Sequence, residues 1–185
     1  MSRSSRAGLG RAMRRPFARD DSGMSAVEFA LILPVMVALY FGAVELANAL
    51  IADRKTTAVA ATVADLATQA PALGDDDIDD IFAAATAIMA PFDAGGMEIV
   101  LTSASDRGGG SIRVDWSDAL NATPRGEDTA VAVPDDIVMP GGSVVIAEVR
   151  FNFVSGVGRF LTGGIDLNDV FYARPRRSLV VARLD

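Results

Sequence analysis

A long apolar stretch near the N-terminus constrains this chain more than any other feature. From Phe29 to Val44 the 16 residues carry no formal charge, and the wider apolar run from Met24 to Ile51 is interrupted by Glu28, Glu45 and Asn48. A helix needs about 20 apolar residues to cross a bilayer. The run therefore predicts a transmembrane helix over residues 24–51, with Glu28 either near an interface or beside a partner.

Charge is distributed unevenly along the sequence. Residues 1–23 contain six arginines and two aspartates, a net charge of +4, and the whole chain carries −7, so residues 24–185 carry −11. Arginines before an apolar segment favour the cytoplasmic side. We therefore expect a basic cytoplasmic leader over 1–23, a single span, and an exposed domain over 52–185. Because that domain is acidic, we expect no binding to nucleic acid.

Other interpretations of the apolar stretch remain open. It is compatible with a plain signal anchor, and also with a secretory signal peptide, since Ala47-Asn48-Ala49 provides an A-x-A site. Cleavage after Ala49 would release a soluble periplasmic binding or adhesion module. The segment Arg14–Phe17, "RRPF", also resembles a twin-arginine signal, but residues 16–28, among them Asp20, Asp21 and Glu28, separate the arginine pair from the long apolar run.

The residue types available exclude several kinds of chemistry. The chain has neither cysteine nor histidine, which excludes Cys–His and Ser–His catalysis and the common zinc sites. The aspartates of residues 75–80 lack the EF-hand spacing, and residues 156–164 lack the G-K-[ST] of a P-loop. Nothing in the spacing of the other acidic residues defines a glycosidase-type pair; these are Asp115, Asp118, Asp135, Asp136 and Asp166. We expect no enzyme activity, no metal and no cofactor.

The start of the apolar run carries a resemblance to a known family. "GMSAVEF" resembles the leader-peptide site of type IV pilins and pseudopilins, and "RDDSGMSAVEFALILPVMVALYFGAVELANAL" is similar to the TadE/TadG-like pilus assembly proteins of tight-adherence (Tad, Flp-type) systems. The matching residues are Asp21, Gly23, Ala26, Val27, Glu28, Phe29, Ala30, Pro34, Gly42 and Glu45. Residues 140–177 resemble the family's paired strands and terminal "RPR" segment more loosely. Some TadG-like members carry a large extra domain, and we expect none in this chain, which has no room for one.

This resemblance implies roles for four residues at the start of the span. A prepilin peptidase would cut between Gly23 and Met24 on the cytoplasmic face, which makes Met24 the new N-terminus. Glu28, followed by Phe29, would then pair with the amine of a neighbouring subunit and set the register between subunits, since pairing neutralises two buried charges. The amine of the same helix is an alternative partner, one turn away. A glutamate in a first turn also simply complements the helix dipole.

The resemblance also bears on the rest of the span and on partners. Pro34 removes a backbone hydrogen bond and predicts a kink. Gly42 and Ala43 offer a small-residue surface for close helix packing, and the resemblance implies Gly42 and Glu45 as the helix-packing residues. The implied protein is a minor pseudopilin or assembly component, held by one span in the bacterial inner membrane. Its implied partners are the lipid bilayer, other pilins and pseudopilins, inner-membrane platform proteins and the prepilin peptidase.

Beyond the span, the sequence predicts a small domain of helices and strands. The helix from about Ser25 should continue to Gln69, because no glycine or proline intervenes between the span and Pro71; its apolar stripe is Val59, Val63, Leu66 and Ala70. A second helix follows, capped by Asp75–Asp77 and ended by Pro91, with a buried face of Ile78, Ile81, Phe82, Ala85 and Met89.

Strand patterns complete the predicted domain. Residues 97–105 and 111–117 predict a hairpin, 121–142 a loop, 143–154 the strongest strand, and a last strand begins at Asp169 and is interrupted by Pro175. The order predicts an α+β, pilin-like fold: a long N-terminal transmembrane helix that continues into a helix packed on a small, mostly antiparallel sheet.

Overall fold

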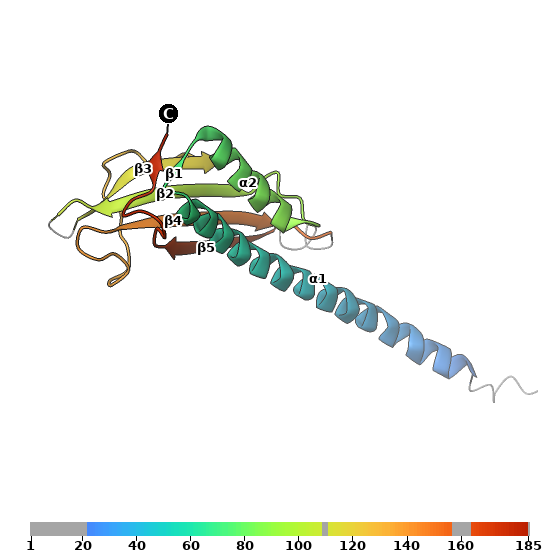
Figure 1. The fold of residues 1–185 in the computed structure, drawn as a ribbon. Coiled ribbons are helices and arrows are strands. Elements are labelled where there is room, and N and C mark those ends of the chain that lie inside the picture. Colours follow the sequence, from blue (N-terminus) through green and yellow to red (C-terminus); the bar gives the residue numbers. More distant parts are fainter. Residues whose placement is uncertain (1–21, 109–110, 157–163, 185) are drawn as a thin grey trace, which may run out of the picture. The chain divides into compact units, whose positions relative to one another are not determined.

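The computed structural model describes residues 22–108, 111–156 and 164–184 (Figure 1). It divides into two compact units, Met1–Gly42 and Ala43–Asp185, and each is described separately. Of the predicted leader, residues 1–21 lie outside the described residues, as do positions 157–163 of the glycine-rich stretch between the last two long strands.

One helix, α1 (Ser22–Gln69), accounts for the N-terminal part of the described chain. The prediction of a continuous helix is confirmed, although it begins three residues earlier than expected. Pro34 lies inside α1, and the helix continues on both sides of it. The many alanine and leucine residues of this segment favour a helix, and proline is tolerated in a helix that lies in a membrane.

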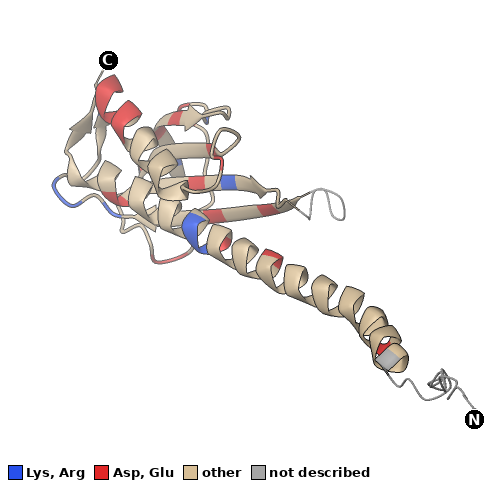
Figure 2. Cartoon of the chain, turned by 90° about the vertical axis from the view of Figure 1, so that its right-hand side faces the viewer, with Lys and Arg blue, Asp and Glu red and all other residues tan. Residues whose placement is uncertain are grey.

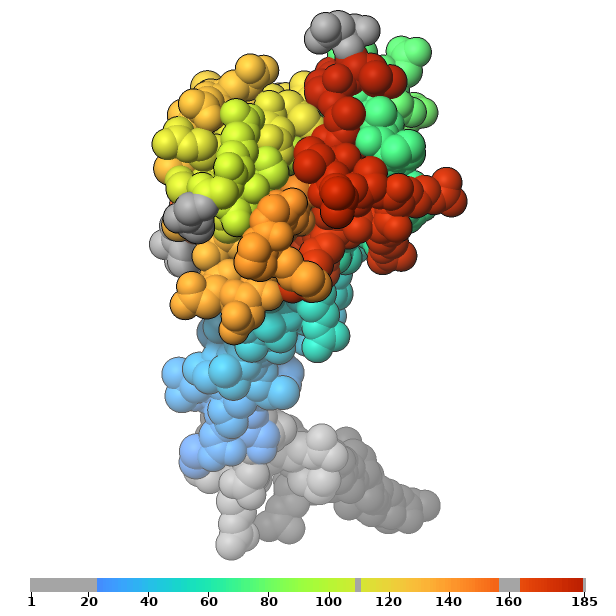
Figure 3. All heavy atoms as spheres, turned by 60° about the vertical axis from the view of Figure 1, so that its left-hand side comes forward, coloured from blue at the N-terminus to red at the C-terminus, as the bar shows by residue number. Residues whose placement is uncertain are grey.

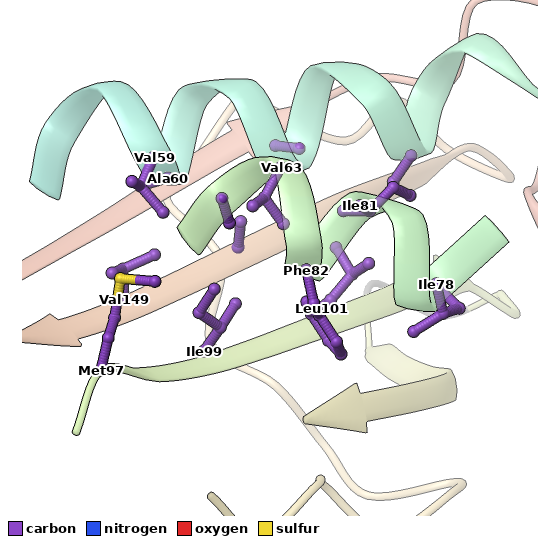
Figure 4. Packing of buried hydrophobic residues seen from close by; sticks show 14 of the residues in the cluster. Val59, Ala60, Val63, Ile78, Ile81, Phe82, Met97, Ile99, Leu101 and Val149 are labelled. Atoms are coloured by element: carbon purple, nitrogen blue, oxygen red, sulfur yellow. The ribbon is translucent and has the colours of Figure 1, made fainter. Parts of the chain in front are cut away.

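Within the second unit, the C-terminal part of α1 packs with α2 (Asp75–Met89) on one face of a sheet (Figures 1 and 4). The expected stripe is confirmed at Val59 and Val63, but Leu66 and Ala70 are only half-buried. Small residues form most of the buried face, because they let α1 approach its neighbours closely. The fully buried residues of this face are Ala52, Thr56, Val59, Ala60, Val63, Ala64, Ala67 and Thr68.

The second helix follows its sequence pattern closely. Its buried residues are the five predicted from periodicity, and it ends two residues before Pro91. The predicted cap is wrong: Gly74 is the N-cap residue, and the aspartates occupy the first turn. Asp77 contributes differently, since its Oδ2 accepts a hydrogen bond of 2.9 Å from the amide of Gly74. The aspartates still complement the positive end of the helix dipole.

Four antiparallel strands form the main sheet, in the order β3-β2-β4-β5. They are β2 (Glu98–Asp106), β3 (Ile112–Leu120), β4 (Ser143–Phe153) and β5 (Ile165–Ala173). The hairpin and the strong strand are confirmed, while the last strand begins four residues earlier than expected. Val145, Ala147, Val149, Phe151 and Phe153 of β4 face the helices and join their core.

A short parallel pair, β1 (Ala72–Leu73) with β6 (Ala182–Arg183), was not predicted. This pair brings the C-terminal segment back to the start of α2. In Figure 3 the C-terminal segment (red) lies on the surface beside residues of α2 (green). The indole Nε1 of Trp116 donates a 2.7 Å hydrogen bond to the carbonyl of Val181, and both residues are buried. The C-terminal segment is therefore fastened to the sheet as well as to β1.

The opposite face of the sheet has a second, smaller core. Ala104, Val144 and Ile146 are buried there under half-buried residues of the 121–142 loop, namely Val131, Val133, Ile137 and Val138. The same loop covers part of the outer edge of β3, since Val114 exchanges backbone hydrogen bonds of 2.9 and 3.0 Å with Asp128 and Thr129. The predicted loop is thus a packed cover that protects an exposed strand edge.

Candidate membrane and assembly segment

Residues 24–44 of α1 are exposed on every side of the helix, and most of them are apolar. Leu31 is 72% exposed, Leu39 69% and Tyr40 67%. Beyond Val44, Leu46, Leu50 and Ile51 are exposed, whereas Glu45, Asn48 and Ala49 are half-buried. The most apolar 18-residue window has a mean hydropathy of 2.2, and none of its residues is buried. Water is a poor solvent for such a surface, and patches of this size mark contact with lipid or protein. By length and composition, α1 fits a single-pass membrane anchor.

The predicted cleavage residues lie at the beginning of this segment. Gly23 and Met24 are in the first turn of α1, and both are exposed. A Cβ added to Gly23 would have no heavy atom within 4 Å. Packing within the described chain therefore gives no reason for a glycine at this position.

Glu28 lies one helical turn after Met24 and is exposed, together with Phe29 at 60%. None of the residues that the structure describes forms an ion pair with the Glu28 carboxylate. Its position agrees with the four-residue spacing to the amine that cleavage would create at Met24. A carboxylate among exposed apolar side chains needs either water or a cationic partner.

The other predicted residues of the segment fall in different units. Pro34 and Gly42 belong to the first, where a Cβ on Gly42 would also meet open space. Glu45 belongs to the second unit, is half-buried, and has one buried carboxylate oxygen, Oε2. Glu28 and Pro34 both lie on α1.

The carboxylates weighed as catalytic candidates are dispersed over the second unit. Asp115 accepts hydrogen bonds from Ser105 and Arg107, Asp166 accepts one from Asn152, and Asp118 binds Arg183. Asp135 and Asp136 lie in the loop that covers the sheet. Among the described residues, no group of three or more acidic side chains is arranged to hold a metal ion.

One arginine is a structural feature that the sequence analysis missed. Arg183 of β6 donates to Asp118 of β3 at 2.9 Å and forms a second ion pair with Asp75 of α2. The hydrogen bonds to Asp118 and then to Asp75 raise the pKa of Arg183 above its ordinary value. Arg183 thus joins β6, β3 and the start of α2. The signal in the sequence was weak, because its partners lie 65 and 108 residues away.

The fold and the exposed segment together define a class: a chain with one apolar N-terminal helix and an α+β unit beyond it. A comparison with family models is more specific, since residues 23–65 match the model described as "TadE-like protein". The resemblance found in the sequence is confirmed over this stretch, which includes Gly23, Glu28, Pro34, Gly42 and Glu45. No match was found among curated proteins or among solved structures.

Proposed function

We propose that this protein is an inner-membrane-anchored minor pseudopilin or assembly component of a Tad-type pilus, with a role in pilus biogenesis and adhesion. One observation carries the proposal: the TadE-like match over residues 23–65 includes the apolar helix segment whose side chains are exposed all round. A pilus subunit needs such a segment twice, first to remain in the membrane and then to contact other subunits. The proposed role is non-enzymatic.

The orientation follows from charge. The arginine-rich leader, residues 1–23, stays in the cytoplasm, residues 24–51 span the bilayer once, and residues 52–185 form a periplasmic domain. Asp53, Arg54 and Lys55 come directly after the span, where charged side chains reach the polar interface. The proposed partners are the bilayer, other pilins and pseudopilins, and platform proteins of the Tad machine.

Processing would occur between Gly23 and Met24. Open space around Gly23 supports this, because the glycine is then needed for recognition by a prepilin peptidase and not for packing within the chain. The cut would create an amine at Met24, one turn from the Glu28 carboxylate. A neighbouring subunit's amine pairs with Glu28 only at the correct axial offset, so the pair fixes register; an offset chain leaves two charges in lipid, at a cost of about a few kcal/mol each.

Pro34, Gly42 and Glu45 support this assembly in other ways. Proline weakens the helix locally, which permits bending when subunits pack. A glycine with open space beside it lets a second helix approach closely. Glu45 is proposed to act at the outer end of the span.

The first experiment is to measure the intact mass and N-terminal residue of the protein from native membranes, with surface pili counted in parallel. We expect a chain that begins at Met24. Gly23→Ala should block processing, whereas Glu28→Ala should leave processing intact and reduce piliation. Asp53→Ala is the matched control, since it removes an acidic group of α1 outside the predicted span. It should change neither processing nor piliation.

Two other results of this measurement would indicate a different processing or role. A soluble chain that begins at Leu50 would mean cleavage after Ala49 and a released periplasmic module. An uncut chain that begins at Met1, with normal piliation in both variants, would leave an anchor without the proposed assembly role for Glu28.

A further inference from the structure

A groove of about 500 Å³ lies between α1 and the edge strand β5 within the second unit. Ala61 and Leu66 of α1 and Phe171 and Ala173 of β5 provide its apolar lining, and Arg174 and Arg176 lie at its rim. Phe171 is 41% exposed. An aromatic ring left open beside small side chains is a typical contact for a protein partner.

The groove is lined by two arginines, Arg174 and Arg176, and by one acidic residue, Asp65, so its lining carries a net positive charge although the chain as a whole is acidic. A third arginine, Arg177, follows directly in the sequence, and we call Arg174, Arg176 and Arg177 the arginine rim. Arg174 donates hydrogen bonds to the carbonyls of Asp136 and Ile137, and Arg176 pairs with Asp65. Arg177 is exposed and forms no ion pair within the part of the chain that the structure describes.

The complementary charge lies on another part of the same chain. The first turns of α2 contain five aspartates in six residues, drawn in red near the C-terminus in Figure 2. Asp75 binds Arg183 and Asp77 binds the Gly74 amide. The other three, Asp76, Asp79 and Asp80, are exposed and form no ion pair with any residue described.

Both features lie at the C-terminal end of α1. The amide of Arg176 donates a 3.2 Å hydrogen bond to the carbonyl of Thr68, in the last turn of α1. Helix α2 begins six residues after α1 ends. Copies of the second unit that lie side by side in the same orientation therefore present the arginine rim and the acidic turns at the same level.

We propose that the groove between α1 and β5 of one copy receives the acidic first turns of α2 from a second copy. This rests on the proposed membrane anchoring, which brings copies of the chain side by side. The contact is heterologous, since one copy contributes its groove and the other contributes its α2. Contacts of this type propagate from copy to copy and close into a ring or continue as a helix.

Crosslinking tests the contact directly, because the chain has no cysteine of its own. Ala83→Cys lies one turn after Asp79 on the exposed side of α2, and Leu179→Cys, at a side chain 79% exposed, lies two residues after the arginine rim. The two full-length variants are mixed in detergent micelles and treated with a short bismaleimide. We expect the mixture to give a crosslinked dimer, and Ala83→Cys alone to give little.

Charge reversal on these cysteine variants identifies the contact. Arg177→Glu or Asp79→Arg alone should lower the yield roughly fivefold, since an exposed ion pair becomes a repulsion, and both reversals together should restore it. Asp93→Arg is the matched control, an exposed acidic residue beyond the C-terminal end of α2, and should leave the yield unchanged. Circular dichroism establishes that each variant is folded.

Three results would overturn the proposal. The first is an unchanged yield after either single reversal, and the second is a double reversal with a yield as low as that of the single ones. The third is a strong dimer with Ala83→Cys alone, which would indicate a symmetric contact. These outcomes are separate from failure of the proposed function, because the micelle experiment needs neither peptidase processing nor pili. A chain that is processed and piliated without the crosslink would refute only this contact.

Discussion

At the scale of single residues, the C-terminal segment is held by a few polar contacts whose partners are distant in sequence. Trp116, the one tryptophan of the chain, donates its indole N–H to Val181 in the core, and Arg183 binds Asp118 and Asp75. Buried donors and acceptors are costly when one partner is removed. These contacts should therefore contribute measurably to the stability of the second unit.

Trp116→Phe tests the first contact. The substitution keeps an aromatic ring but leaves the Val181 carbonyl without its donor, so we expect the free energy of unfolding to fall by about 1–3 kcal/mol. Urea denaturation followed by circular dichroism measures it, since the variant loses the fluorescent residue. Tyr40→Phe, at an exposed position on α1, serves as the control. Equal stability of the Trp116→Phe and wild-type chains would contradict the role given to this bond.

Arg183→Gln tests the second contact. Its charge-assisted hydrogen bonds are only partly exposed to solvent, and we expect a loss of about 1–3 kcal/mol. The folded pKa of Arg183 is raised, so its contribution is complete below the unfolded pKa and is lost only as pH rises through the folded pKa, far above pH 9. The loss should thus be the same at pH 7 and pH 9. Arg54→Gln, an exposed arginine of α1 without an ion pair among the described residues, should change stability by less than about 0.5 kcal/mol.

At the scale of elements, local patterns predicted most of the fold. The period of α2 identified all five of its buried residues, and alternation in β4 identified its helix-facing side. The sequence missed β1 and β6, since two-residue strands have too little pattern to detect. It also missed the second core, because the apolar residues of the 121–142 loop are separated by prolines and polar residues, and only tertiary packing places them on Val144 and Ile146.

The residues of the candidate segment could be predicted from the sequence, but their contacts could not. Glu28, Pro34 and Gly42 were identified from sequence because the motif is continuous and lies within one helix. Their partners could not be derived, since each residue faces open space in a single copy. The arginine rim and the groove were not anticipated either, because α1 and β5 meet there from positions more than 100 residues apart.

The close packing of α1 predicts how larger side chains on its buried face would affect stability. Ala60 and Ala64 are fully buried against α2 and the sheet, and a larger side chain forces the layers apart. Ala64→Leu should destabilise the second unit by about 1–3 kcal/mol. Ala58→Leu, on the exposed side of the same helix, provides the matched control and should be nearly neutral. Thermal unfolding in detergent compares them; similar melting temperatures would contradict the close packing of α1.

At the scale of the whole molecule, burial divides the chain into two parts. One is an apolar segment that is exposed in a single copy, and the other is a unit with a hydrophobic core of its own. The core of the second unit begins at Ala52, and Ala49 is the first residue that packs against it. The amine of Lys55 also bonds the carbonyl of Ile88 at 2.6 Å, which ties α1 to the end of α2. Residues 24–42 contribute no buried side chain. Their apolar surface therefore belongs to contacts outside the single copy.

Truncation tests this division. A chain that begins at Ala43 keeps every residue of the core, and we expect it to be far less dependent on detergent than the full chain and to unfold within a few degrees of it. A chain that begins at Thr57 loses Ala52, Thr56 and the Lys55 bond, so it should be destabilised by several kcal/mol, which exceeds the loss from most single substitutions. Differential scanning calorimetry of both chains, beside the full chain in detergent, supplies the comparison. If the Ala43 chain were unfolded while the full chain is folded, the apolar segment would be required for the stability of the second unit, and its assignment to membrane and subunit contacts alone would be wrong.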